Sequence, residues 1–151
     1  MVRRAAAEDT FPSVEHVLGG RGVLGVRPQS LLDWVGMIRE GLPAAAVESI
    51  LSTVHLSQAE LAQALGIPER TLARRKREGV LNSEESSKLL RIARVISRAS
   101  EVFDDPAAAV DWLKSQNVAL RGNAPLSLLD TDIGAESVLD TLGRIEHGVF
   151  A

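Results

Sequence analysis

Apolar residues recur every three or four positions along most of this chain, which is the spacing of one face of an α-helix. The longest such segment runs from Ser83 to Phe103, and Asn82 with Glu85 is spaced as a capping box at its start. The last segment runs from Thr131 to Gly148. Shorter helices are expected from Val14 to Leu18, from Pro28 to Gly41, from Pro43 to Val54 and from Pro106 to Leu113, with a flexible turn at Gly19 to Gly22. No segment alternates apolar and polar residues with a period of two. The pattern therefore predicts an all-α protein.

Residues 57–79 have the pattern of two short helices joined by a tight turn. Ser57 and Glu60 are spaced as a capping box, in which each side chain accepts a hydrogen bond from the backbone N–H of the other. Gly66 suits a turn that requires positive φ, and Pro68 suits the first turn of a helix. The second helix is strongly basic. This arrangement is the one that places a recognition helix in the major groove of DNA.

The basic second helix supplies most of the candidate DNA contacts. The residues expected to bond phosphates or base edges are Gln58, Arg70, Thr71, Arg74, Arg75 and Arg77. Positions 74–77 are continuously charged, and successive helical positions turn by about 100°, so all four cannot face the groove. One or two of them are expected to pair with Glu69, Glu78 or another chain. The competing interpretation is an ordinary helical hairpin whose charges are solvated.

Charge is unevenly distributed along the chain, which has 151 residues and a net charge of −3. Residues 69–98 hold nine Lys and Arg against four Asp and Glu, a local charge of +5. Residues 99–151 hold three basic and nine acidic residues, a local charge of −6. A basic segment beside an acidic one predicts two different partners: operator DNA for the first, and a more basic surface for the second.

Several classes of site are excluded by the composition. There is no cysteine, so disulfides and thiolate metal sites cannot form. His16, His55 and His147 are far apart and match no metal-ligand spacing, and no catalytic Ser–His–Asp or carboxylate pair can be assigned. We therefore expect no metal, no cofactor and no enzyme activity. The apolar runs are too short to span a bilayer and the N-terminus lacks a signal-peptide core, so a cytoplasmic protein without a membrane partner is expected.

From about Ser57 onward, the chain resembles the Xre/MbcA/ParS-type antitoxins. The most specific match follows the helix-turn-helix: Trp112-Leu113 ends one helix, the linker 117–120 comes next, and Pro125-Leu126 with Leu128-Leu129 follows. Gly134, Val138, Leu142, Ile145 and Gly148 complete the match. The resemblance implies a Cro/Xre-like helix-turn-helix bundle followed by a small helical toxin-binding domain. It also implies an antitoxin that blocks a RES-domain toxin, an enzyme that degrades NAD, and that represses its own operon.

The same resemblance places the toxin contact in the C-terminal domain. The candidate toxin-binding residues are Asp140, Arg144, Glu146, His147, Val149, Phe150 and Ala151. Phe150 beside the chain's carboxylate offers the flat ring and the anion that an NAD pocket accepts, so the tail is expected to enter the toxin's active site. The competing interpretation is a frayed terminus.

Three regions are predicted along the chain. Residues 1–55 form an N-terminal helical segment, residues 56–99 the helix-turn-helix region and residues 100–151 the toxin-binding domain. The apolar residues of the first region, Leu31, Leu32, Trp34, Val35 and Ile38, predict a homodimer through this segment, within a larger toxin–antitoxin hetero-oligomer, because helix-turn-helix proteins reach two half-sites by dimerising. The alternative function is a Cro-like transcription repressor whose C-terminal domain serves self-association or small-molecule sensing.

Overall fold

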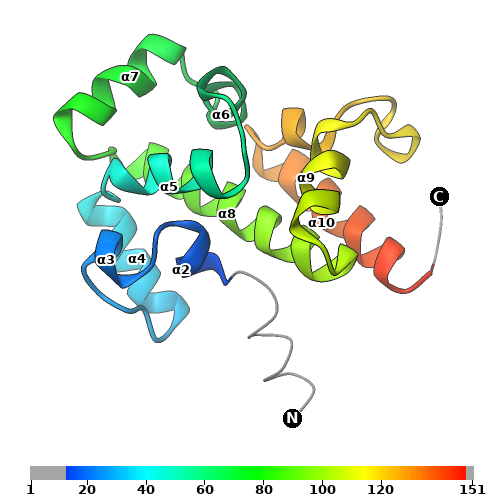
Figure 1. The fold of residues 1–151 in the computed structure, drawn as a ribbon, viewed down its shortest axis with the longest axis horizontal. Helices are drawn as coiled ribbons and strands as arrows, with labels where there is room; N and C mark the ends of the chain where they lie inside the picture. Colours follow the sequence, from blue (N-terminus) through cyan, green and yellow to red (C-terminus); the bar gives the residue numbers. More distant parts are fainter. Residues whose placement is uncertain (1–12, 149–151) are drawn as a thin grey trace.

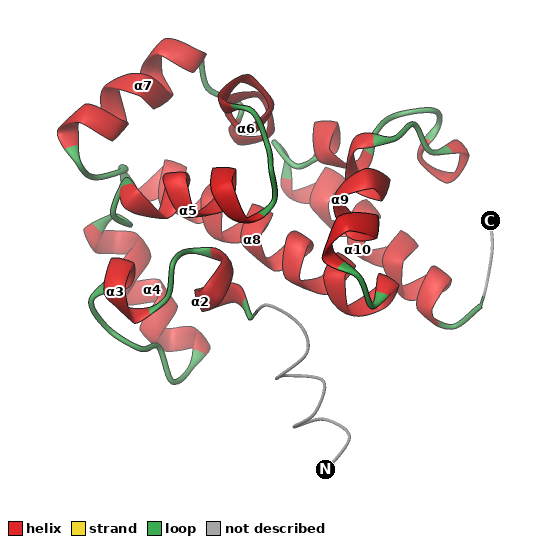
Figure 2. Cartoon of the chain, in the orientation of Figure 1, coloured by secondary structure: helices red, strands yellow, loops and turns green. Residues whose placement is uncertain are grey.

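The computed structural model describes residues 13–148, and these residues form helices joined by short loops, with no β-strand among them (Figure 2). The α-helices are α2 (Val14–Val17), α3 (Arg21–Leu24), α4 (Leu31–Glu40), α5 (Ala45–Thr53), α6 (Gln58–Leu65), α7 (Glu69–Glu78), α8 (Ser83–Phe103), α9 (Pro106–Lys114) and α10 (Asp132–Glu146). Two 3₁₀ helices, η1 (Val118–Leu120) and η2 (Pro125–Leu128), lie between α9 and α10. The predicted all-α class is confirmed.

Helix α8 crosses the middle of the molecule and contacts helices of both halves of the chain (Figure 1). On one side it packs against α2, α4 and α6, and on the other against α9 and α10. A buried hydrogen bond, from the Leu42 backbone N–H to Ser86 Oγ at 2.8 Å, joins the start of α8 to the chain before α5. The helix therefore belongs to both the N-terminal and the C-terminal packing units.

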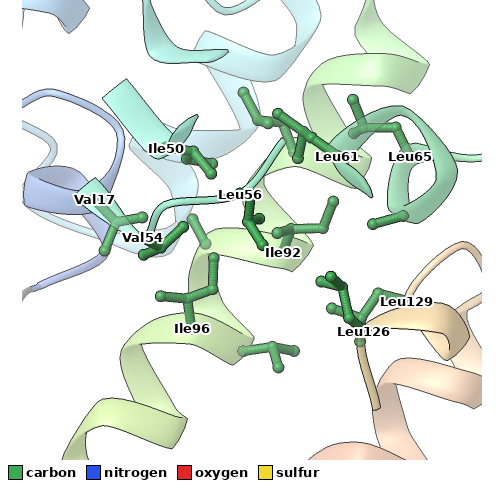
Figure 3. Packing of buried hydrophobic residues seen from close by; sticks show 14 of the residues in the cluster. Val17, Ile50, Val54, Leu56, Leu61, Leu65, Ile92, Ile96, Leu126 and Leu129 are labelled. Atoms are coloured by element: carbon green, nitrogen blue, oxygen red, sulfur yellow. The ribbon is translucent and has the colours of Figure 1, made fainter. Parts of the chain in front are cut away.

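The hydrophobic core is continuous along α8. Ile92 and Ile96 lie between residues of the first half of the chain, such as Val54, and Leu126 and Leu129 of the second half (Figure 3). Aliphatic residues make up nearly all of this core. Burying each large aliphatic side chain stabilises the fold by about 1.5–3 kcal/mol relative to leaving it in water, so the two halves stabilise each other.

Local signals in the sequence set most helix starts. Both predicted capping boxes form: Ser57 with Glu60 at α6, and Asn82 with Glu85 at α8. Gly66 ends α6 with a left-handed φ of 70°. The expected turn at residues 19–22 is wrong in part, because α3 begins at Arg21 and buries Leu24.

Two ion pairs fix the last helix along α8. Arg91 donates to the Leu129 carbonyl at 3.2 Å and also pairs with Asp132, at the start of α10. Arg98 pairs with Glu146 near the end of α10. Between these points Val138 and Leu142 are buried, whereas Ile133, in the first turn of α10, is exposed.

Candidate functional site

Helices α6 and α7 have the geometry of a helix-turn-helix. Ala62 and Leu65 of α6 and Leu72 of α7 are buried between them and α8. The Ile67 backbone N–H donates to the Ala62 carbonyl at 3.1 Å across the left-handed turn at Gly66. This packing leaves the other face of α7 in solvent.

The arginines of α7 separate into two groups in the structure. Arg70, Arg74 and Arg77 are exposed, and among residues 13–148 neither Arg70 nor Arg77 has an ion-pair partner. Arg74 makes one loose pair, with Nε 3.8 Å from Glu78. These three side chains are free to reach an anion outside the protein.

Arg75 is partly buried and forms ion pairs with two carboxylates of the protein. Its Nε donates to both carboxylate oxygens of Glu85, at 2.8 and 3.1 Å, and its Nη1 donates to Glu78 at 3.1 Å. Hydrogen bonds to Glu85 and Glu78 raise the pKa of Arg75. The expectation that one or two of the charges at 74–77 pair with a residue such as Glu78 is confirmed.

Lys76 is also engaged within the fold. Its Nζ donates to Gln58 Oε1 at 2.9 Å and pairs with Glu48 of α5. Gln58 therefore keeps only its NH₂ group for an outside acceptor. Thr71, the other uncharged candidate, is half-buried in the first turn of α7.

The C-terminal candidates also fall into two groups. Asp140 and Arg144 are exposed on α10 and line one open cavity. Glu146 instead accepts two hydrogen bonds from Arg98, at 2.9 and 2.6 Å, and this pair holds the pKa of the Glu146 carboxyl below its usual range. His147 lies beside it, with Nε2 3.9 Å from Glu146. Val149, Phe150 and Ala151 lie outside the described residues.

Two residues of this region were missed by the sequence interpretation. Val118, in η1, has 94% of its surface exposed, and Arg121 follows with a left-handed φ of 57°. Arg121 lines the same cavity as Arg144. The sequence signal for a tight turn here was Asn117 followed by Arg121-Gly122, because Asn and Gly are frequent in such turns.

A polar contact joins the C-terminal unit directly to the helix-turn-helix. Lys114, the last residue of α9, donates to the His55 carbonyl at 3.1 Å and pairs with Glu60 at 3.3 Å. Glu60 is also the capping-box residue of α6. Its hydrogen bond from the Ser57 backbone N–H, together with Lys114, lowers the pKa of Glu60.

Helix α4 presents an exposed apolar surface. None of its residues is buried, and Leu31 and Leu32 are 70% and 79% exposed. Trp34, Val35 and Ile38 line a groove whose other walls are Leu90 and Val95 of α8 and Leu139 of α10. Contiguous apolar surface of this kind marks an interaction site.

Within residues 13–148, no three His, Asp or Glu side chains are grouped so as to hold a metal ion. No helix in that range has the length and hydropathy needed to cross a membrane.

Comparison with known proteins matches the two halves of the chain separately. Residues 33–94 match the antitoxin Xre-like helix-turn-helix domain. Residues 98–148 match the antitoxin Xre/MbcA/ParS C-terminal toxin-binding domain. The fold and these matches define a helix-turn-helix protein that carries a toxin-binding domain.

The similar proteins are antitoxins. Antitoxin Xre of Yersinia enterocolitica is 37% identical over 119 residues, which are 78% of this chain and 80% of that protein. The Prs ADP-ribosylating antitoxin of a Sphingobium species is 27% identical over 81% of this chain and 83% of its own length. This chain belongs to the Xre antitoxin family, as the sequence resemblance predicted.

The fold is shared with a protein of known structure. A chain in the crystal structure of the M. tuberculosis MbcT–MbcA toxin–antitoxin complex superposes with a TM-score of 0.56 and 24% identity, over 72% of this chain and 96% of that one.

Proposed function

We propose that this protein binds and inhibits a cognate toxin that consumes NAD, and that it represses its own operon through α6 and α7. The observation that carries the proposal is the toxin-binding domain at residues 98–148, joined to a helix-turn-helix by the shared helix α8. An antitoxin of this build links neutralisation of the toxin to control of its synthesis.

The toxin we propose is a RES-domain enzyme that degrades NAD. A second candidate is an ADP-ribosylating toxin, because one relative is named for that activity. Both toxins cleave NAD, but only the second leaves ADP-ribose on a protein. Expressing the neighbouring gene with and without this chain distinguishes them. Loss of cellular NAD without modified protein supports the RES enzyme, and ADP-ribose on a protein supports the other. If the chain relieves neither effect, the antitoxin proposal is wrong.

The inhibitory contact we propose uses the surface of α10 and the tail that follows it. Asp140, Arg144 and His147 are exposed there and form a polar rim. A pocket that holds the two phosphates of NAD is electropositive, so it attracts the acidic C-terminal unit, whose residues 99–151 carry a local charge of −6. Deleting residues 149–151 is expected to restore toxin activity while the complex still forms. Protection that persists after this deletion assigns inhibition to the body of the domain.

The DNA contact we propose is made by Arg70, Arg74 and Arg77, which are the exposed arginines of α7. Gln58 and Thr71 add hydrogen bonds, and Arg75 positions α7 from within. A mobility-shift titration with the protein's own promoter tests this assignment. Arg70→Glu with Arg77→Glu is expected to abolish the shift, and a shift of unchanged affinity would refute the proposed reading face.

The oligomer we propose is a homodimer through α4. On this helix, Leu31 lines the groove together with Val35, Leu90 and Leu139, and the exposed Leu32 lies beside it, so the two leucines form a ridge at the edge of the groove. A ridge next to a groove is self-complementary about a two-fold axis, since the ridge of each copy fills the groove of the other. Such a dimer presents two recognition helices to two half-sites.

A further inference from the structure

A cavity on the C-terminal unit brings together both arginines of an otherwise acidic region. It has a volume of about 320 Å³ and opens between η1, η2 and α10. Residues 99–151 contain only two arginines, Arg121 and Arg144, and both line this cavity. Because they come from separate elements, the fold and not the sequence spacing brings them together.

Both guanidinium groups are available to a partner. Neither Arg121 nor Arg144 has an ion pair or hydrogen bond from its side chain to any residue in the range 13–148, whereas Arg91 and Arg98, on the face of α8 toward α10, are paired. The hydroxyls of Ser137 and Thr141 donate to carbonyls within α10, at 3.0 and 2.9 Å. The arginines are therefore the main free donors in the cavity.

The loop that carries Arg121 is held in one shape by its own hydrogen bonds. Asn117 N–H donates to the Asn123 carbonyl at 3.2 Å, Gly122 N–H to the Asn117 carbonyl at 2.8 Å, and Asn123 Nδ2 to the Leu120 carbonyl at 2.8 Å. Leu120 is buried as the anchor of this loop, and Val118 protrudes from it. This loop therefore presents an exposed apolar side chain, Val118, beside two neighbouring arginines. Arginines are enriched among the residues that contribute most to protein–protein binding, so this surface favours a protein partner.

The charge around the cavity favours a single carboxylate as its ligand. Asp140 also lines the cavity. Together with Arg121 and Arg144 it gives the lining a net charge of +1. A single carboxylate balances this charge of +1 and can accept the paired N–H groups that a guanidinium presents, whereas a dianionic phosphate would leave a negative charge in the cavity.

We propose that this cavity binds an Asp or Glu side chain of the cognate toxin, with Val118 packed against an apolar residue beside it. The inference rests on the proposed antitoxin function and adds the chemistry of the contact. It separates two parts of the interface: the tail and its acidic surroundings meet a basic toxin pocket, and the Arg121–Arg144 cavity meets an acidic toxin residue. Opposite signs at two points fix the orientation of the complex and exclude toxins that lack the acidic residue.

Titration calorimetry of the full chain against catalytically inactive cognate toxin tests the proposal. Arg121→Glu with Arg144→Glu is expected to weaken binding by about 100-fold or more, the scale of a charge reversal at a buried interfacial ion pair. The control is Arg21→Glu with Arg27→Glu, which makes the same change of charge at exposed arginines of α3 and of the loop that follows it. The control is expected to bind within about twofold of the wild type, because surface charges far from an interface contribute little.

The possible outcomes test the cavity proposal and the antitoxin function separately. If the double variant binds as the control does, the cavity proposal is overturned and the antitoxin function stands. If the wild type itself does not bind the toxin, both are overturned. Arg121→Ala with Arg144→Ala, which only shortens two exposed side chains, provides the same comparison if the reversed charges impair folding. It is expected to weaken binding by about tenfold.

Discussion

The guanidinium of Arg75 lies across the carboxylate of Glu85, with Nε 2.8 Å from Oε1 and 3.1 Å from Oε2. Glu85 is only 5% exposed and also accepts the Asn82 backbone N–H of the capping box at 2.9 Å. One carboxylate thus fixes the start of α8 and the orientation of α7. Helix α7 is thus positioned by an ion pair with the start of α8.

Replacing Arg75 is expected to lower stability more than replacing a neighbouring arginine. Arg75→Ala leaves the buried Glu85 without its cation, which is more costly than losing a solvated charge. Arg77→Ala is the matched control, because Arg77 is exposed and has no ion pair within the described residues. Thermal unfolding followed by circular dichroism should give a lower Tm for Arg75→Ala only. Equal Tm values would show that the pair contributes nothing to stability.

Arg77→Ala is expected to change DNA binding in the way that loss of one phosphate contact does. The slope of log K against log salt concentration should become shallower by about 1, with affinity reduced on specific and unrelated DNA alike. Fluorescence anisotropy at several salt concentrations measures the slope. Arg39→Ala, at an exposed arginine of α4, should leave it unchanged. A loss restricted to the operator would instead assign Arg77 to base recognition.

Two glycines of α10 are expected to respond oppositely to the same substitution. A Cβ at Gly134 would lie 1.8 Å from the Leu128 carbonyl oxygen, so Gly134→Ala must displace backbone and is expected to destabilise by about 3 kcal/mol. A Cβ at Gly143 meets nothing within 4 Å, so Gly143→Ala should stabilise by about 0.5–1 kcal/mol through helix propensity. Urea unfolding gives both values. A stable Gly134→Ala protein would contradict the close approach of η2 to α10.

Acid is expected to loosen the end of α10. Arg98 holds the pKa of Glu146 below its ordinary value of 4.5, so this pair stabilises the fold above that pH and the contribution is lost as pH falls through the lowered pKa. The contribution is about 0.5–1 kcal/mol because both groups are partly exposed. Glu146→Gln should flatten the dependence of unfolding free energy on pH below 4.5. Glu136→Gln, at an exposed carboxylate of the same helix, should leave the dependence as in the wild type.

Charge placed on the ridge of α4 is expected to dissociate the proposed dimer. Leu31→Asp with Leu32→Asp replaces side chains that are 70% and 79% exposed, so the fold should persist. Light scattering should report a monomer with an unchanged circular dichroism spectrum. Val118→Asp changes an equally exposed apolar residue in η1 and should remain dimeric. A double variant that stays dimeric would place the interface elsewhere.

Features that depend on neighbours in sequence were predictable. The capping boxes at Ser57 and Asn82 and the left-handed turn at Gly66 involve residues within four positions of each other, and each was predicted from the sequence. The pairing of Arg74 and Arg75 with Glu78 was similarly accessible from helical spacing.

Features that depend on tertiary contacts were not predictable in this way. Glu85, the main partner of Arg75, lies in the next helix, and only the three-dimensional structure shows that the two side chains meet. Arg121 and Arg144 are separated by a helical turn, a loop and most of α10, so their shared cavity has no signature in the sequence. Helix α3 forms in a glycine-rich segment because Leu24 is buried there, which overrides weak helix propensity.

The continuity of α8 through both halves of the molecule bears on how such proteins diversify. Ile92 and Ile96 contribute to a single core that both halves complete, and Lys114 adds a polar contact to Glu60. A hybrid made by joining the first half of one family member to the second half of another would therefore have to match along the whole of α8. We expect few recombined chains to meet this condition. The operator and the toxin that a family member is proposed to bind are therefore expected to be inherited together.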